Sequence, residues 1–114
     1  MRISSIFGTN LDLTDAIEQY VTERVSGLEK LTSDFSSVAE LKVELGKTSQ
    51  HHQSGPYYFA EFHLEAPGTN INIHTEGEDL YAVIDEARDD LKRQLVDRKE
   101  KLLDQRKQPR PGKE

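Results

Sequence analysis

Basic side chains recur at helical spacing near the carboxyl end of the chain. Side chains four or seven residues apart share one face of an α-helix, so these residues would form a single cationic stripe. Lysine and arginine heads on a rigid scaffold neutralise phosphates and release counterions, which gives affinity for nucleic acid of any sequence. The stripe consists of Arg88, Lys92, Lys99 and Arg106, and it is flanked by Arg93, Arg98, Lys101 and Lys107.

Two further cations, Arg24 and Lys30, accompany an earlier amphipathic segment, outside its apolar face or at its rim. If the two helices lie side by side, both sets of cations would line one groove. Proteins that read structured RNA by its shape need little more than such a geometry. Four acidic residues favour the alternative of a solvated helix whose charges pair with each other: Asp89, Asp90, Asp97 and Glu100.

The distribution of charge indicates an electrostatic partner for the carboxyl-terminal part. The chain has 114 residues and a net charge of −6. Residues 1–87 carry 5 basic and 15 acidic side chains (−10), whereas residues 88–114 carry 10 basic and 6 acidic ones (+4). Such asymmetry favours a polyanion facing the basic part. The acidic remainder would repel indiscriminate binding and favour one well-fitted site.

Residues suited to catalysis or metal binding are sparse. Cysteine is absent, which excludes disulfides, thiol catalysis and Cys-ligated zinc, and the scattered glycines form no phosphate-binding loop. His51 and His52 lie in a turn-forming segment, which indicates a polar loop. His63 and His74 could sit opposite one another on a solvated sheet face and, with a neighbouring glutamate, resemble a two-histidine, one-carboxylate metal site; exposed strand residues explain them more simply. The sequence predicts no enzyme, metal, cofactor or small-molecule substrate.

Length and composition indicate one domain, which we expect at residues 1–107, with a disordered basic tail at 108–114. The chain is 34% hydrophobic and 32% charged, so much of it must be solvated. No apolar run approaches the roughly 20 residues needed to cross a bilayer, and the amino end has no secretory hydrophobic region. We therefore expect a cytoplasmic protein that is monomeric when free and does not bind membranes.

Hydrophobic periodicity predicts a strand that ends at Gly8 and then a helix for which Thr14 is a suitable N-cap. Because Leu28 and Leu31 stay in phase with the apolar face of this helix, we expect the helix to continue through Gly27 despite the cost of glycine. The apolar face consists of Ile17, Tyr20, Val21, Val25, Leu28 and Leu31.

Apolar and polar residues then alternate in three segments, which is typical of half-buried strands. These segments begin at Val38, Tyr57 and Asn70; the long loop Gly46–Pro56 joins the first two, and Pro67–Gly68 forms a turn between the last two. A second helix starts at about Glu78. Its apolar face consists of Leu80, Val83, Ile84, Ala87, Leu91, Leu95 and Leu102.

This order of elements predicts an α+β fold, β-α-β-β-β-α, in two layers. Short connections favour an antiparallel meander for the last three strands, and the crossover through the first helix should be right-handed and join two parallel strands. Each helix has one apolar stripe, so both would pack on the same face of a four-stranded sheet.

Two stretches resemble a known family. EGEDLYAVID followed by LKRQL, and NLDLTDAIEQYVTERVSGLEKL near the amino end, are similar to the ribosome hibernation factors: the short hibernation promoting factor and the ribosome-associated inhibitor, or ribosomal subunit interface protein. The similarity covers about residues 2–103. It implies a fold like that of double-stranded-RNA-binding domains. It also implies binding of the small ribosomal subunit in the channel for mRNA and tRNA, with translation inhibited during stress or stationary phase.

In that family, basic side chains on the helices contact 16S ribosomal RNA. The resemblance implies this role for Arg24, Lys30, Arg93, Lys99 and Lys101, whereas Arg88, Lys92 and Arg98 are predicted from the cationic stripe alone.

The chain departs from the family at Gly27, Asp90 and Asp97, where other members often carry lysine. The resemblance is to the short members, so we expect no second domain of the kind that dimerises ribosomes in long hibernation factors, and the sequence leaves open whether ribosomes are paired or held singly. Because these lysines are missing, the sequence also supports an alternative function. The chain could be a protein-interaction module of the same fold that has weak or no RNA binding and uses its acidic surface or a sheet edge.

Overall fold

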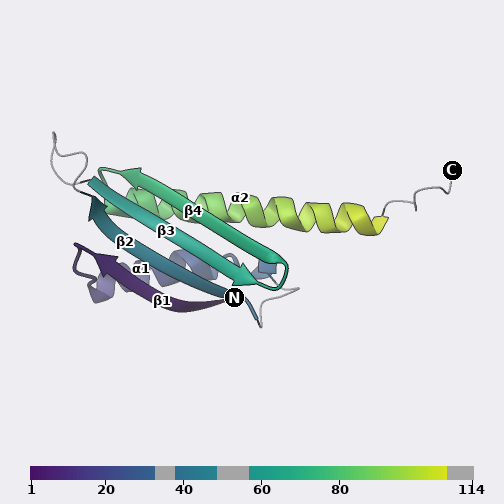
Figure 1. Cartoon of the computed structure of the whole chain (residues 1–114), viewed down its shortest axis with the longest axis horizontal. Helices are drawn as coiled ribbons and strands as arrows, with labels where there is room; N and C mark the ends of the chain where they lie inside the picture. The colour runs from purple at the N-terminus through teal and green to yellow at the C-terminus, as the bar shows by residue number, and fades with distance from the viewer. Residues whose placement is uncertain (33–37, 49–56, 108–114) are drawn as a thin grey trace.

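The computed structural model describes residues 1–32, 38–48 and 57–107, with side chains as far as Lys101. Its elements follow the order β1-α1-η1-β2-β3-β4-α2, where η1 is a short 3₁₀-helix. One sheet forms the first layer and the helices lie together behind it (Figure 1). The predicted α+β, two-layer fold is confirmed. Predictions for five side chains and two segments lie outside the described residues: His51, His52, Leu102, Arg106, Lys107, residues 49–56 of the predicted loop and the tail (108–114). The first three residues of that predicted loop, Gly46–Thr48, belong to the second strand instead.

The sheet has four strands in the order β1-β2-β3-β4. β1 is parallel to β2, and the two remaining pairs are antiparallel, as the connections predict. Gly68 has a φ of +72°, which glycine adopts without strain in the turn between β3 and β4. The strands are β1 (Arg2–Thr9), β2 (Glu40–Thr48), β3 (Tyr57–Ala66) and β4 (Thr69–Gly77).

The core lies between the sheet and the helices. Leu41 pairs with Leu64, which in turn pairs with Ile71, so the inward residues of adjacent strands meet side by side. Their neighbours along each strand face solvent because side chains alternate between the faces. The helices α1 (Asp15–Ser26) and α2 (Leu80–Lys107) cover the apolar face. Their buried residues are Ile17, Val21, Val25, Leu80, Val83, Ile84, Ala87, Leu91 and Leu95.

The helices begin at polar caps, but the first one ends earlier than predicted. The Thr14 side chain accepts a hydrogen bond from the Ile17 amide, and Asp79 caps α2 through the amides of Tyr81 and Ala82. The expectation that α1 continues through Gly27 is wrong. The helix ends at Ser26, and η1 (Glu29–Thr32) follows. Leu28 is nevertheless fully buried, because a 3₁₀ turn also returns the chain to the same side after about three residues.

The two strand histidines are not opposite each other, so the two-histidine arrangement that the sequence left open as the less simple explanation does not form. His63 pairs with Asn72, whereas His74 pairs with Glu61. The His74 ring is bonded on both sides, with Nδ1 2.9 Å from Glu61 and Nε2 2.8 Å from Glu76. The hydrogen bond to Glu76, together with that to Glu61, raises the pKa of His74 against the opposing effect of desolvation. Within the described part of the chain, no group of three or more His, Cys, Asp or Glu side chains could hold a metal ion.

None of the described helices is long and apolar enough to span a membrane. The longest, α2, is amphipathic, and its polar side carries the cations on which the site depends.

Replacing Gly27 by alanine should stabilise the fold. Gly27 has φ −70° and ψ −6°, which any residue adopts, and an added Cβ would lie 3.8 Å from the nearest side-chain atom, in Arg88. Because alanine restricts the unfolded chain, we expect the free energy of unfolding in urea to rise by about 0.4–1 kcal/mol. Gly68→Ala is the matched control: its positive φ should lower stability by about 1 kcal/mol. Equal effects of the two changes would contradict this account.

The paired carboxylates should make stability depend on pH through His74. Because its folded pKa is raised, the stabilisation is fully present below the unfolded pKa of about 6.5 and is lost as pH rises through the folded value. The stabilities of wild type and His74→Gln in urea should therefore differ most near about pH 6 and converge as pH rises through the folded pKa of His74. A difference that grew with pH would show that the imidazolium is not the stabilising form.

Candidate nucleic-acid interface

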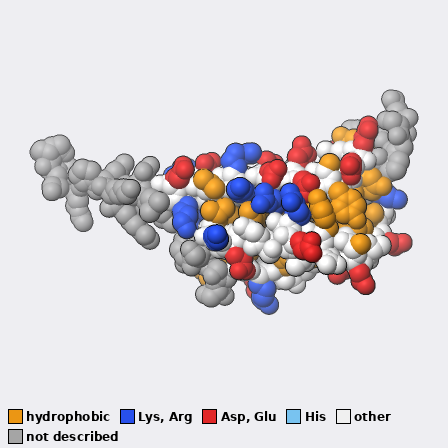
Figure 2. Space-filling view, turned by 180° about the vertical axis from the view of Figure 1, so that it is seen from behind, with side chains coloured by type: hydrophobic (Ala, Val, Ile, Leu, Met, Phe, Trp, Pro, Cys, Tyr) orange, Lys and Arg blue, Asp and Glu red, His pale blue; other side chains and the backbone are white. Residues whose placement is uncertain are grey.

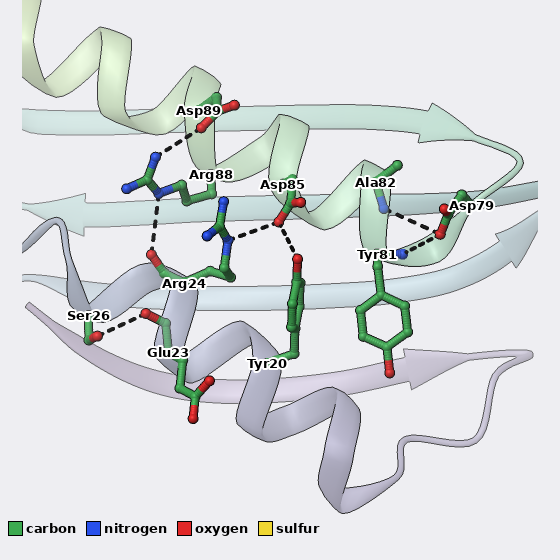
Figure 3. Close-up of polar contacts among 10 residues, drawn as sticks. All are labelled: Tyr20, Glu23, Arg24, Ser26, Asp79, Tyr81, Ala82, Asp85, Arg88 and Asp89. Atoms are coloured by element: carbon green, nitrogen blue, oxygen red, sulfur yellow. Dashed lines mark hydrogen bonds and ion pairs between the residues drawn. The ribbon is translucent and has the colours of Figure 1, made fainter.

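The two α-helices are joined by a carboxylate on α2. Asp85 Oδ1 accepts a hydrogen bond from the Tyr20 hydroxyl at 2.7 Å and another from Arg24 Nε at 2.9 Å (Figure 3). Both donors lie four residues apart on α1 and so share one face. The bond to Asp85, reinforced by desolvation, raises the pKa of Tyr20, so the hydroxyl stays a donor to a higher pH than an ordinary tyrosine. This three-residue contact fixes the distance and the rotation of one helix against the other.

Arg88 reaches across the same seam from α2. Its Nε donates to the Arg24 carbonyl oxygen at 3.3 Å, and its Nη1 lies 2.9 Å from Asp89 (Figure 3). The Arg88 side chain is only 21% exposed, and the carbonyl that it caps belongs to the last turn of α1. Arg24 and Arg88 therefore hold the helices together and, at the same time, place two positive charges along the seam.

The lysines continue the seam toward the carboxyl end of α2. Lys99 Nζ donates to the Lys30 carbonyl oxygen at 3.3 Å, which brings η1 and α2 into contact. Lys92, one stripe position earlier, is exposed. Among the described residues, the side chains of Lys30 and Lys92 form no ion pair. We call the following set the seam cations: Arg24, Lys30, Arg88, Lys92 and Lys99. Lysine and arginine side chains gather in a band across the middle of the helix face (Figure 2).

Three predicted site residues lie away from the seam. Arg93 points outward and pairs with Asp90 at 3.0 Å. Arg98 Nε donates to the Thr69 hydroxyl at 3.0 Å, on the side of α2 that faces β4. Arg98 and Lys101 both line a hollow of about 430 Å³ beside the β3–β4 turn. The five seam cations therefore share one side of the helix pair, whereas these three lie elsewhere; a role in RNA binding stays a prediction for all eight.

The acidic residues of α2 are concentrated on its outer side. At 100° per residue they follow one another around the solvent-facing surface, between the seam and the β4 side. This arrangement leaves the seam as the positive side of the helix and makes the outer surface unfavourable for phosphate. The residues are Glu86, Asp89, Asp90, Asp97 and Glu100.

The three departures from the family pattern have distinct positions. Gly27 lies beside the Arg88 guanidinium, so a lysine there would extend the seam. Asp90 neutralises Arg93, and Asp97 lines the hollow with Arg98 and Lys101. Asp90 and Asp97 therefore lie outside the seam and do not directly reduce its positive charge.

Sequence reasoning missed the residues that organise the seam. Asp85 was not singled out, although it lies three residues before Arg88 and so belongs to the same stripe. Tyr20 was assigned to the apolar face, yet its hydroxyl makes the shorter of the two bonds to Asp85. The sequence did contain a signal for this contact. Asp85 is an acid on a cationic stripe, and Tyr20 and Arg24, four residues apart on the other helix, are both able to donate to it.

Comparison with known proteins identifies relatives over nearly the whole chain. Residues 5–103 match the family model described as sigma 54 modulation protein / S30EA ribosomal protein. A protein named ribosome hibernation promoting factor from Azotobacter vinelandii is 35% identical over 108 residues, covering 95% of this chain and 92% of that protein. The Escherichia coli K12 protein of the same name is 34% identical over 98 residues, covering 86% of this chain and 94% of that protein.

Among solved structures, the N-terminal domain of Thermus thermophilus Protein Y superimposes with a TM-score of 0.70 at 33% identity. The match covers 83% of this chain and 96% of that domain. Four strands and two α-helices thus recur in the same arrangement in a relative of known structure.

Removing the Asp85 carboxylate should loosen the helix pair. Asp85→Asn keeps the side-chain volume but weakens two charge-assisted hydrogen bonds, one of which is also an ion pair. After discounting for solvent exposure, we expect a loss of about 1 kcal/mol in the free energy of unfolding, and the pKa of Tyr20 should fall toward its ordinary value. Urea unfolding and alkaline absorbance titration measure the two effects.

Arg93→Gln is the control for this experiment. It breaks the ion pair with Asp90, in which Arg93 is 65% exposed, and should change stability by less than about 0.5 kcal/mol. If Asp85→Asn were as mild as Arg93→Gln, the seam contact would not be what holds the helices in place.

Proposed function

The chain belongs to the sigma 54 modulation protein / S30EA ribosomal protein family, and on that premise we propose that it is a ribosome hibernation factor. In this proposal it binds the small ribosomal subunit in the channel for mRNA and tRNA, contacts 16S ribosomal RNA there and inhibits translation during stress or stationary phase. The role is non-enzymatic, and the protein acts in the cytoplasm as a monomer when free. Relatives of similar length named ribosome hibernation promoting factor support this function.

The observation that carries the proposal is the position of the seam cations. Five basic side chains from α1, η1 and α2 belong to the seam, and contacts between the elements hold three of them, Arg24, Arg88 and Lys99. Asp85 lies within the seam and Asp89, on the adjoining outer side of α2, pairs with Arg88; subtracting both acids leaves an excess of three positive charges. A row of cations on two rigid helices is suited to the phosphates of a folded RNA. Counterion release would supply the affinity of the protein for the RNA, and the shape of the RNA would supply the specificity.

The rest of the surface restricts how RNA can approach. The outer side of α2 is acidic. On the open sheet face, Glu44, Glu61 and Glu76 outnumber Lys47 and His74 around a shallow hollow. Phosphates would be repelled from both surfaces. The protein should therefore bind in one orientation, with the helix seam toward RNA, rather than coat nucleic acid in general.

Internal ion pairs support a second candidate function, a protein-interaction module with weak RNA binding. Arg24, Arg88 and Arg93 each contact an aspartate of this chain, which reduces the charge available to a partner. Sedimentation with purified small subunits at low salt separates the two functions. Co-migration supports the hibernation factor, whereas its absence supports the interaction module.

Reversing the seam lysines should abolish ribosome binding. The triple change of Lys30, Lys92 and Lys99 to Glu removes three potential phosphate contacts while leaving the core and the Asp85 contact in place. We expect affinity for small subunits to fall on the order of 100-fold or more, with loss of translation inhibition in a cell-free system. For the wild type, each phosphate contact should add about 0.7–0.9 to the slope of log affinity against log salt.

A charge-matched control lies in the sheet layer. Changing Arg2, Lys42 and Lys47 to Glu alters the net charge by the same amount, but on exposed positions of β1 and β2. This variant should retain most of its affinity. Equal losses in both triple variants would show that net charge, and not the seam, governs binding, and normal inhibition by the seam variant would refute the proposed surface.

A further inference from the structure

An exposed aromatic ring lies on the same stripe of α2 as the seam cations. Tyr81 precedes Asp85 by four residues, Arg88 by seven and Lys92 by eleven, spacings that place all four on one side of the helix. Its side chain is 41% exposed. Figure 3 shows the Tyr81 ring next to Tyr20, beyond the Asp85 contact, at the amino-terminal end of the seam.

Contact with Tyr20 restricts the orientation of the Tyr81 ring. Its centroid lies 4.7 Å from that of Tyr20, with the two planes at 90°. Tyr20 is itself fixed by its hydrogen bond to Asp85. An edge-to-face contact occupies at most one of the two faces of each ring. Tyr81 therefore retains a face that Tyr20 does not cover, on a side chain whose orientation is already restricted.

The charges around Tyr81 favour a neutral partner over a phosphate. Asp79 lies two residues away, and its carboxylate caps the first amides of α2. Asp85 is engaged by Tyr20 and Arg24. These two acids would repel a phosphate at the ring, whereas an uncharged aromatic base suffers no such repulsion. The nearest exposed seam lysine, Lys92, lies about 16 Å farther along the helix axis, at 1.5 Å per residue.

We propose that Tyr81 is a stacking platform for an unpaired nucleobase of the RNA whose phosphates contact the seam cations. This inference rests on the proposed function and adds a recognition element to the same site. Base stacking on an aromatic side chain tolerates any base sequence but requires a base that has left its helix. Tyr81 thus selects RNA with an unstacked base at one end of the seam, which phosphate contacts alone do not.

The first test compares variants of the full chain in binding to purified bacterial small ribosomal subunits over a series of salt concentrations. Tyr81→Leu should weaken binding by about 5- to 100-fold, and Tyr81→Phe, which keeps the ring, by no more than about twofold. Because tyrosine is uncharged, neither change should alter the slope of log affinity against log salt. Lys92→Gln, in contrast, should reduce that slope by about 0.7–0.9.

The second test detects stacking directly. The chain has no tryptophan, so Tyr81→Trp introduces a single tryptophan into it. Its emission, taken as the difference from the wild-type complex, should be quenched when a base stacks on it in the subunit complex. Phe7→Trp is the control, because Phe7 is 50% exposed and pairs with Glu44 on the open sheet face. Its emission should not change. Thermal unfolding of each variant confirms that it is folded.

The outcomes distinguish the inference from the function on which it rests. If the wild type binds with the expected salt dependence but Tyr81→Leu binds within about twofold of it, the stacking role is wrong and the proposed function stands. If Tyr81→Leu binds more weakly but Tyr81→Trp shows no quenching, the ring contacts a ribosomal protein, and the proposal of a stacked nucleobase is wrong. If the wild type does not bind small subunits, both proposals fail.

Discussion

The Asp85 carboxylate is the contact on which the arrangement of the helices depends. A single oxygen accepts bonds from Tyr20 and Arg24, and the Arg88 guanidinium then reaches the end of α1. Bringing several cations together along two helices is unfavourable unless an opposite charge lies among them. Asp85 supplies that charge from within the seam, so it both offsets the repulsion and fixes the register of the helices. The same acid orients Tyr20, and through it the exposed ring of Tyr81.

The surface of the protein is divided by sign, and the division gives a direction to binding. Cations follow the seam, whereas acids occupy the outer side of α2 and part of the open sheet face. An overall charge of −6 would suggest no affinity for RNA, but the average conceals a local positive ridge. A protein of this kind gains specificity from repulsion as well as attraction, because most other orientations bring like charges together.

The fold was predictable because its elements differ in hydrophobic period, and errors arose where the period is ambiguous. Leu28 kept the phase of α1, yet phase alone does not separate an α-helix from a helix that ends and is followed by a 3₁₀ turn. The histidine register could have been deduced: a turn at Pro67–Gly68 pairs Ala66 with Thr69 and hence Glu61 with His74. The division between the seam cations and the three basic residues outside the seam could not be deduced. Sequence spacing shows which residues share a side of α2, but it does not show which side meets α1.

An electron cryomicroscopy map of the protein bound to the small ribosomal subunit would show which surface meets the RNA. We expect the α1–α2 seam to face ribosomal RNA, with Lys30, Lys92 and Lys99 within contact distance of phosphate oxygens and the open sheet face turned away. A map in which RNA contacted the sheet face or the acidic outer side of α2, with the seam exposed to solvent, would contradict this expectation.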